Sequence, residues 1–191
     1  MQKLPRSFYL RPTLQVAKDL LGRYLVRTLP QANLIGKIVE VEAYLPNDPA
    51  SHAYNGKTKR NEVMFNQGGH LYVYFTYGMH FCANVVTEEE GIGSAVLIRG
   101  IEPISGTEAM EQNRGMTGFN LTNGPAKFCQ AFALGRNENG IDLLGDEIYI
   151  TEGEHIPKEQ VGTSTRIGIS VGTEKKWRFF INKNPWVSKK K

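Results

Sequence analysis

Two carboxylates and a tyrosine are spaced along one short segment so that they could do acid–base chemistry together. The segment from Ile38 to Tyr44 alternates apolar and polar residues, which is typical of a β-strand. Because side chains alternate faces along a strand, Glu40, Glu42 and Tyr44 would share one face. Two carboxylates close together can raise one pKa, as an acid–base group requires. The pattern suits a pocket in which Glu42 activates a water beside a stacked flat ring, and it suits a salt-bridged strand glutamate equally.

A tyrosine-rich stretch at residues 70–84 predicts a hairpin whose strands cover residues 71–75 and 80–86. Its turn at Tyr77-Gly78 would place an aromatic side chain at the tip of the hairpin. Such a side chain could enter DNA as a wedge, or it could simply cap the hairpin.

Further polar and aromatic residues could complete a binding pocket. Tyr44, His52 and Tyr74 could form a stacking slot, although tyrosines in strands commonly serve only cross-strand packing. Asn84 follows an apolar run, and a buried asparagine there could contact the edge of a base or satisfy backbone groups. The sequence leaves both alternatives open for each of these residues.

Arg99 lies inside an otherwise apolar segment, residues 94–101, which reads as another strand. A buried arginine needs an anionic partner, so Arg99 indicates a nearby carboxylate or phosphate. Lys57, Lys59 and Arg60 could bind phosphates, although most charge runs are solvated loops.

The remaining segments indicate an α+β fold, with several mostly antiparallel strands against a few helices. Helical patterns occur at residues 13–22, at 108–114 and after Asn123, a candidate N-cap followed by Pro125 in the first turn. Strand patterns occur at residues 23–30, 34–45, 147–151, 165–171 and 177–181. Residues 46–69 form a long polar loop, and long ordered loops are often functional.

Length and composition bound the class of protein. At 191 residues we expect one domain, residues 1–191, and the net charge of +4 permits a nucleic-acid partner without requiring one. Cys82 and Cys129 suggest packed, reduced thiols, and the four histidines show no metal-ligand spacing. No apolar run suits a membrane span and no signal-peptide pattern is present, so a cytoplasmic protein is expected.

An ordered set of motifs carries a resemblance to a known family. These motifs are Ile38–Tyr44, Arg60-Asn61, Met64-Phe65, Leu71–Tyr74, Tyr77-Gly78-Met79, Phe81-Cys82 with Asn84, Gly124–Lys127 and Pro185–Ser188. In order and spacing they resemble the alkyladenine (3-methyladenine) DNA glycosylase family over nearly the whole chain. Because the chain adds little to this core, we expect a bacterial member. The resemblance implies one α+β domain with a curved, open-barrel-like antiparallel sheet and a protruding hairpin.

The resemblance also implies roles in catalysis. Glu42 matches the general base that activates a water to attack C1′ of the deoxyribose. Arg99 matches the arginine that helps to hold this water and the phosphate of the flipped nucleotide. The backbone carbonyl of Ile167 matches the remaining group that holds the water.

Further roles concern the damaged base and the DNA. Tyr44, His52 and Tyr74 match the slot that sandwiches the extruded base, and Asn84 matches the residue that disfavours guanine by crowding its 2-amino group. Tyr77 matches the side chain that enters the minor groove. The other residues expected near the DNA are Arg60, Met64, Met79, His80 and Lys127. Three departures from the animal pattern are a shorter loop between Tyr44 and His52, His80 where tyrosine is usual, and a longer acidic segment at residues 87–93.

The implied activity is hydrolysis of the N-glycosidic bond of damaged purines, which are flipped out of duplex DNA to leave an abasic site. The compatible purines are 3-methyladenine, 7-methylguanine, hypoxanthine and ethenoadenine. The resemblance implies a monomer that needs no metal and no cofactor, with double-stranded DNA as its partner. Two alternatives remain: a non-catalytic nucleic-acid-binding module related to the C-terminal part of formyltransferases, and a glycosidase of nucleosides or sugars that uses Glu40 and Glu42 as its carboxylate pair.

Overall fold

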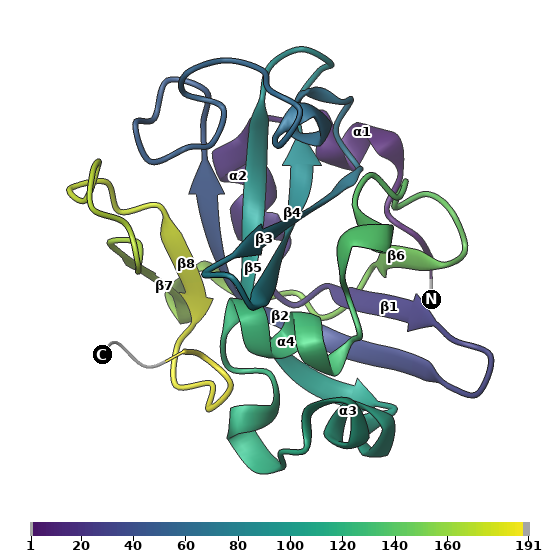
Figure 1. The fold of residues 1–191 in the computed structure, drawn as a ribbon. Helices are drawn as coiled ribbons and strands as arrows, with labels where there is room; N and C mark the ends of the chain where they lie inside the picture. The colour runs from purple at the N-terminus through teal and green to yellow at the C-terminus, as the bar shows by residue number, and fades with distance from the viewer. Residues whose placement is uncertain (1, 189–191) are drawn as a thin grey trace.

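A curved antiparallel β-sheet forms the centre of the computed structural model, which describes residues 2–188 (Figure 1). Its strands are β1 (Tyr24–Thr28), β2 (Asn33–Tyr44), β3 (Leu71–Thr76), β4 (His80–Thr87), β5 (Ser94–Ser105), β6 (Ile148–Thr151), β7 (Val161–Ser164) and β8 (Arg178–Ile181). In space they follow the order β3-β4-β5-β2-β1-β6, while β8 pairs with β2 and carries β7 outside it. Together with the helices, this sheet confirms the α+β prediction.

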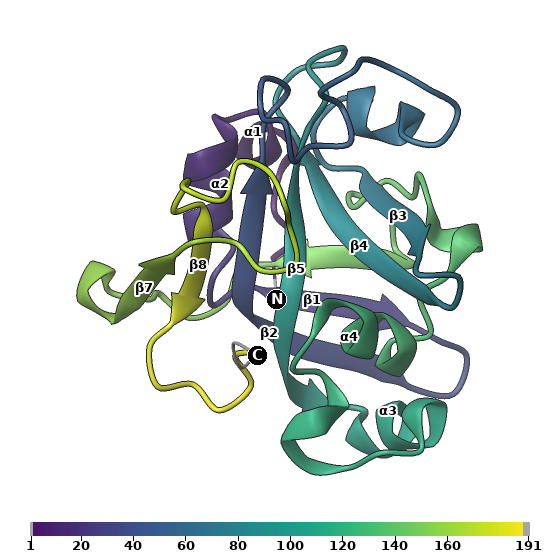
Figure 2. The same ribbon diagram turned by 60° about the vertical axis from the view of Figure 1, so that its left-hand side comes forward.

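Short helices cover the sheet on both sides. They are the α-helices α1 (Arg6–Tyr9), α2 (Thr13–Asp19), α3 (Thr107–Arg114) and α4 (Pro125–Ala131), with 3₁₀ turns at Glu62–Phe65, Gly118–Leu121, Arg136–Glu138 and Lys158–Gln160. Figure 2 shows α1 and α2 on one side of β2 and β5, and α3 and α4 on the other. No helix within residues 2–188 is long and apolar enough to cross a membrane.

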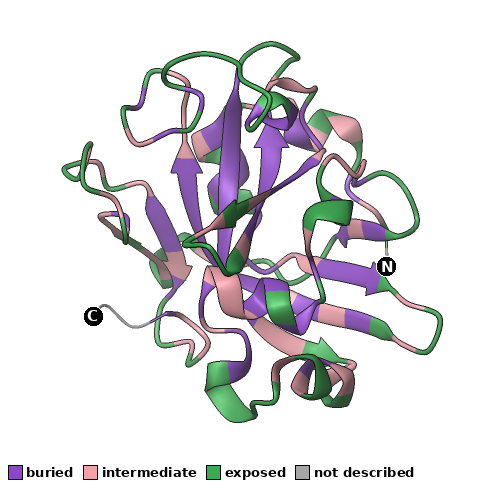
Figure 3. Ribbon diagram, in the orientation of Figure 1, coloured by how far each residue is buried: buried purple, intermediate pink, exposed green. Residues whose placement is uncertain are grey.

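The core lies where these helices meet the central strands. Ile98 and Ile101 of β5 are fully buried, as are Phe128 and Phe132 at α4. Figure 3 shows the central strands as buried and the connecting loops as largely exposed. Burying a large apolar side chain contributes roughly 1.5–3 kcal/mol, so this packing fixes the strands that carry the site.

Strand β2 changes partners along its length, and the change occurs at Glu40. Its first half pairs with β1, and its second half pairs with β8 from Glu40 to Glu42. The register between β2 and β5 shifts on both sides of Glu40, which is the signature of a bulge. Gly100 lies opposite, where an added Cβ would be 2.8 Å from the carbonyl oxygen of Trp186 and 3.3 Å from the Cβ of Glu40. The sheet therefore bends where the carboxylates lie.

The β3–β4 hairpin ends in the three-residue turn Tyr77-Gly78-Met79, between the paired residues Thr76 and His80. Tyr77 has a φ of 52° and Gly78 a φ of 68°, so both occupy the left-handed region. The side chains of Tyr77 and Met79 are 80% and 71% exposed. Figure 2 shows the turn projecting beside α4, as expected for a protruding hairpin.

Two local predictions from the sequence are wrong. Residues 165–171 do not form a strand: β7 ends at Ser164, and the following residues form an irregular loop. Their alternating apolar residues resemble a strand, but the N–H of Ile167 bonds to a side chain of β2 instead of a neighbouring strand. The N-cap of α4 is Gly124 and not Asn123, whose side-chain oxygen accepts a hydrogen bond from Lys127.

Candidate active site

The carboxylate of Glu42 is fully buried and is met by donors from three segments. Its Oε1 accepts a 2.7 Å hydrogen bond from the backbone N–H of Ile167, and its Oε2 accepts a 2.9 Å bond from the hydroxyl of Tyr44. Nη1 of Arg99 lies 3.4 Å from Oε2 and 3.5 Å from the carbonyl oxygen of Ile167. The general-base candidate is thus held in one orientation by residues that border a cavity.

Burial dominates the electrostatics of this carboxylate. It raises the pKa of Glu42, and the charge of Arg99, the N–H of Ile167 and the hydroxyl of Tyr44 offset only part of this effect. The nearby Glu40 adds a further upward contribution, so the pKa of Glu42 lies above its ordinary value. A carboxyl group with a raised pKa is suited to accepting a proton near neutral pH.

Glu40 has a different set of partners, although it shares a strand face with Glu42. Its oxygens accept bonds of 2.6 Å from Nε of Arg178, 2.6 Å from the N–H of Ser188 and 2.7 Å from the hydroxyl of Ser188. Both glutamates are fully buried and neither lines the cavity, but Glu42 bonds to the lining residues Tyr44 and Ile167, whereas Glu40 bonds to Arg178 and Ser188. This carboxylate therefore anchors β8 and the segment that ends at Ser188, which speaks against the glycosidase alternative.

Arg99 has the anionic partners that the sequence required. Its Nε lies 3.4 Å from Glu40, and its Nη1 lies 3.4 Å from Glu42. Burial lowers the pKa of Arg99, but the charges of Glu42 and Glu40 more than compensate, so the guanidinium remains charged. One cation thus compensates two buried carboxylates and still reaches the cavity wall.

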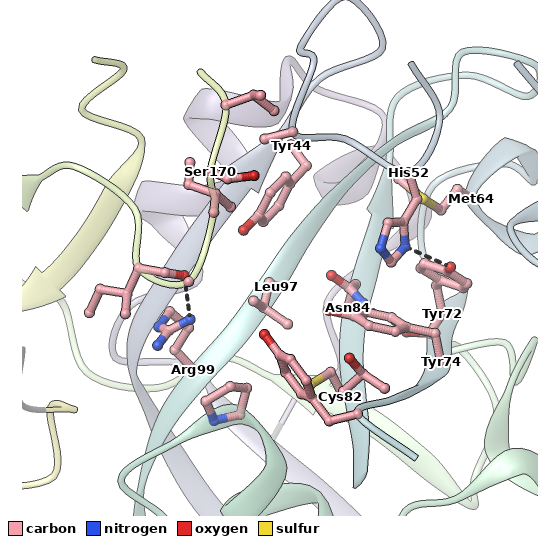
Figure 4. A pocket seen from close by; sticks show the side chains of 18 of the residues that line it. Tyr44, His52, Met64, Tyr72, Tyr74, Cys82, Asn84, Leu97, Arg99 and Ser170 are labelled. Atoms are coloured by element: carbon pink, nitrogen blue, oxygen red, sulfur yellow. Dashed lines mark hydrogen bonds between the residues drawn. The ribbon is translucent and has the colours of Figure 1, made fainter. Parts of the chain in front are cut away.

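Aromatic side chains line a cavity of about 440 Å³ next to these charges. Figure 4 shows Tyr44 on one side and His52 and Tyr74 on the other, with Asn84 and Leu97 between them. The rings of His52 and Tyr74 meet edge to face, with centroids 4.5 Å apart and planes at 79°. The three predicted slot residues are therefore brought together around one space.

Hydrogen bonds and burial determine the protonation states of His52 and Tyr44. Nδ1 of His52 lies 3.0 Å from the hydroxyl of Tyr72. Although its outer face is open to solvent, burial of the inner face lowers the pKa of His52, and the charge of Arg60 lowers it further. The imidazole is therefore neutral at neutral pH. Burial raises the pKa of Tyr44 far above its ordinary value, and the charge of Glu42 raises it further. The hydroxyl therefore stays protonated and can donate its hydrogen bond to Glu42.

Asn84 is buried in the cavity wall, and its amide nitrogen donates a 3.1 Å hydrogen bond to the carbonyl oxygen of Tyr72. This bond holds the side chain between the rings (Figure 4). The Asn84 amide bonds to the backbone and also faces the cavity. It could therefore satisfy a backbone group and contact the edge of a base at the same time.

The residues expected near DNA fall into two groups. Tyr77, Met79 and His80 are exposed around the hairpin turn, and exposed Arg60 reaches the carbonyl of Phe75 on the same hairpin over 3.5 Å. Met64 differs from these exposed residues, because it is buried and lines the cavity.

Lys127 and the acidic segment also have defined places. Lys127 bonds to the side-chain oxygens of Asn120 and Asn123 over 3.2 and 2.7 Å. The acidic segment 87–93 follows the end of β4 opposite the hairpin turn, so it does not lie beside Tyr77.

Two further residues that the sequence patterns did not predict line the cavity. They are Tyr72 on β3 and Cys82 on β4, and Cys82 pairs with Tyr74 across the hairpin. Strand alternation from Tyr74 could have found Tyr72, and the hairpin register, which pairs Tyr74 with Cys82, could have found the thiol. Within residues 2–188, no three His, Cys, Asp or Glu side chains are grouped as metal ligands.

Known proteins are similar to this chain over nearly its whole length. Residues 7–185 match the family model described as methylpurine-DNA glycosylase. A protein from Carboxydothermus hydrogenoformans named "Putative 3-methyladenine DNA glycosylase" is 54% identical over 189 residues, which cover 98% of this chain and 99% of that protein.

Proteins of the same name from two other bacteria are also similar. The Chlorobaculum tepidum protein is 47% identical over 99% of this chain and 92% of its own length. A Francisella tularensis protein is 49% identical over 93% of this chain and 94% of its own length. Because the family model and these relatives cover almost all of the sequence, this chain belongs to the methylpurine-DNA glycosylase family.

Proposed function

We propose that this protein is a monofunctional DNA glycosylase of base-excision repair, which removes alkylated or deaminated purines from duplex DNA. The observation that carries the proposal is the buried carboxylate of Glu42, which is held by three residues that line an aromatic cavity, Ile167, Tyr44 and Arg99. Family membership supports DNA as the substrate. The whole chain, residues 1–191, would act as one domain and as a monomer.

The first step is extrusion of the damaged nucleotide. A base inside a duplex is out of reach of the cavity, so the enzyme must flip it out. Tyr77 stands at the exposed tip of the hairpin, in a left-handed backbone conformation that is costly for a residue other than glycine. Its side chain is suited to enter the minor groove and fill the space that the base leaves. Met79, His80 and Arg60 would contact the duplex around it.

The second step is selection of the extruded base. Purines alkylated at N3 or N7 are cationic, and the electron-rich rings of Tyr44 and Tyr74 bind a cation better than a neutral base. His52 is neutral and adds no repulsion. Asn84 would crowd the 2-amino group of guanine, since its hydrogen bond to Tyr72 holds it in the wall. These contacts select alkylated purines and hypoxanthine over normal guanine.

The third step is hydrolysis. Glu42 accepts a proton from a water as that water attacks C1′, the C1′–N bond breaks, and its electron pair leaves with the purine. A cationic alkylated purine departs as a neutral base, whereas neutral hypoxanthine takes up a proton as it leaves. Nη1 of Arg99 lies within reach of both Glu42 and the carbonyl of Ile167, and these groups would orient this water. The ionised carboxylate also stabilises the oxocarbenium-like transition state. No lysine lies among the cavity-lining residues of the described chain, which supports water rather than an amine as the nucleophile.

The test is base release from duplexes that carry a single hypoxanthine and, separately, from methylated DNA, with Glu42→Gln as the control. Release that the substitution abolishes, with strand breaks only after alkali, supports the proposal. Release from methylated DNA alone narrows the substrates to cationic purines. Tight duplex binding without release from either substrate overturns it in favour of a non-catalytic binding module.

A further inference from the structure

A buried ion pair joins the two loops that border the aromatic slot. Asp48 belongs to the loop after β2 that leads to His52, and Arg166 belongs to the loop after β7. Both terminal nitrogens of Arg166 reach the carboxylate of Asp48, Nη2 over 3.0 Å, and both side chains are fully buried. A forked pair of this kind fixes direction as well as distance, because the guanidinium and the carboxylate are both planar.

Arg166 also contacts the residues around the general-base candidate. Its Nη1 donates a 3.0 Å hydrogen bond to the carbonyl of Ala43, the residue between Glu42 and Tyr44. Its guanidinium lies over the ring of Tyr44, 4.7 Å from the centroid, and Arg166 itself does not line the cavity. The ring that borders the slot is thus supported from behind by a cation.

The backbone next to Arg166 makes the contact with Glu42. The N–H of Ile167 donates to Glu42 over 2.7 Å, and its carbonyl lies 3.5 Å from Arg99. In the described part of the chain, no backbone-to-backbone hydrogen bond holds residues 166–172. The side chain of Arg166 holds this loop instead, through Asp48, Ala43 and the carbonyl of Gly172, which it reaches over 3.2 Å.

Asp48 organises the opposite loop in the same way. Its carboxylate accepts a 3.3 Å hydrogen bond from the N–H of Ala50, and its carbonyl accepts one of 2.8 Å from Ser51. Burial raises the pKa of Asp48, but the hydrogen bonds and charge of Arg166 outweigh this effect and hold the pKa below its ordinary value. The ion pair is therefore charged at neutral pH. A Cβ at Gly172 would lie 2.9 Å from the Asp48 carboxylate, so the loop passes too closely for a larger residue.

We propose that the Arg166–Asp48 pair is a positioning device for the reaction, which locks the loops on both sides of the slot and holds the Ile167 amide and the Tyr44 ring against Glu42. The proposal rests on the function proposed above, because it assigns Glu42 as the base. It assigns no contact with substrate to Arg166 or Asp48.

The proposal makes a specific claim about pH dependence. The groups that face Glu42 are Arg99 from β5, Tyr44 and Glu40 from β2, and Cys82 from β4, and the loop contributes the Ile167 amide. That amide lowers the pKa of Glu42. If the loop is released, the Ile167 amide moves away from Glu42 and the pKa of Glu42 rises. As the pH falls, Glu42 then becomes protonated at a higher pH than in the wild type. The acid limb of the pH–rate profile then moves to higher pH.

The test compares Arg166→Lys with wild type in single-turnover excision of hypoxanthine across pH. We expect the acid limb to move upward and the plateau rate to fall by roughly 10- to 100-fold, as for a small misplacement of reacting groups. Exchange of the Ile167 amide hydrogen with solvent, measured by NMR, should become faster. If Arg166→Lys does not fold, Asp48→Asn serves instead, since it keeps the volume and one acceptor.

The matched control is Arg27→Lys. Arg27 pairs with Glu138 over 2.8 Å with similar burial, and neither residue lines the cavity. This control should lower the melting temperature without moving the acid limb. An unmoved limb and unchanged Ile167 exchange in Arg166→Lys, with the same loss of melting temperature as the control, would overturn the proposal. Persistent excision by Glu42→Gln would instead overturn the proposed function, and the Ile167 exchange would then decide separately whether the pair holds the loop.

Discussion

The hydroxyl of Tyr44 donates a 2.9 Å hydrogen bond to Glu42, its next-but-one neighbour on the same face of β2. Tyr44 also lines the cavity with its ring. One residue thus touches both the space for the base and the carboxylate proposed to activate the water. Binding of the base and tuning of the carboxylate can be separated by removing only the hydroxyl.

Tyr44→Phe should slow excision by roughly 10- to 100-fold, because a hydrogen bond to a charged group contributes about 1.5–3 kcal/mol. The hydroxyl lowers the pKa of Glu42, so its loss raises that pKa further. The acid limb should move to higher pH, while lesion affinity stays close to that of wild type because the ring remains. Single-turnover rates and binding titrations measure the two effects. Loss of affinity with an unmoved limb would contradict the dual role.

Tyr77→Ser should impair extrusion of the damaged base, because serine cannot fill the gap in the stack. Unstacking costs a few kcal/mol, so the flipped population should fall roughly tenfold or more. A fluorescent base analogue next to the lesion reports extrusion. Tyr54→Ser is the matched control, since Tyr54 is 51% exposed and lies outside the cavity wall. Equal extrusion by Tyr77→Ser and wild type would remove Tyr77 from this role.

Asn84→Ser should increase excision of undamaged guanine, because the smaller side chain leaves room for the 2-amino group. Loss of the hydrogen bond to Tyr72 should cost about 1 kcal/mol of stability. Guanine released from unmodified duplex DNA is the quantity to measure. A variant that remains folded and still spares guanine would show that selectivity arises elsewhere.

Glu40→Gln should destabilise the fold more than it slows the reaction. Glu40 compensates the buried Arg178, and removing one charge of a buried pair costs about 3–5 kcal/mol. Urea unfolding gives the loss of stability, and excision measured where the variant is folded gives the rate. A fully folded variant without activity would revive the carboxylate-pair alternative.

Glu42→Gln should be more stable than wild type near neutral pH. The pKa of Glu42 is raised on folding, so its ionised form opposes folding at pH values above its unfolded pKa. The neutral amide removes this cost, and the gain should shrink as pH falls and the wild-type carboxyl becomes protonated. Melting temperatures of both forms across pH test this. A lower melting temperature at every pH would mean that the contacts of the carboxylate outweigh its burial.

Local patterns in the sequence were sufficient to predict which side chains share a strand face. Alternation along Ile38–Tyr44 placed Glu42 and Tyr44 together, because the twofold period of a strand is a property of the backbone alone. The turn at Tyr77-Gly78 likewise predicted the exposed tip of the hairpin. The general requirement that a buried arginine find an anion predicted the partners of Arg99.

Long-range contacts explain what the sequence could not supply. The bulge at Glu40 depends on three strands meeting, and it decides that Glu40 turns to Arg178 while Glu42 turns to the cavity wall. The segment 165–171 has the alternation of a strand, yet the ion pair of Arg166 and the Ile167 amide hold it as a loop. Met64 is buried in one cluster with Ala53, Tyr72 and Val86, a grouping of distant segments that no local pattern predicts.

The hydrogen-bond donors to Glu40 are synthesised late, so the site cannot be completed until the C-terminal part of the chain has been made. Its donors, Arg178 and Ser188, come 138 and 148 residues later, and the amide that meets Glu42 comes 125 residues later. Since a nascent chain emerges N-terminus first, β2 is made long before the groups that compensate its carboxylates. A ribosome-bound intermediate would therefore carry two glutamates without their full set of donors in the centre of its sheet. The donors of Glu40 and Glu42 are complete only after the chain from Ile167 to Ser188 has been added.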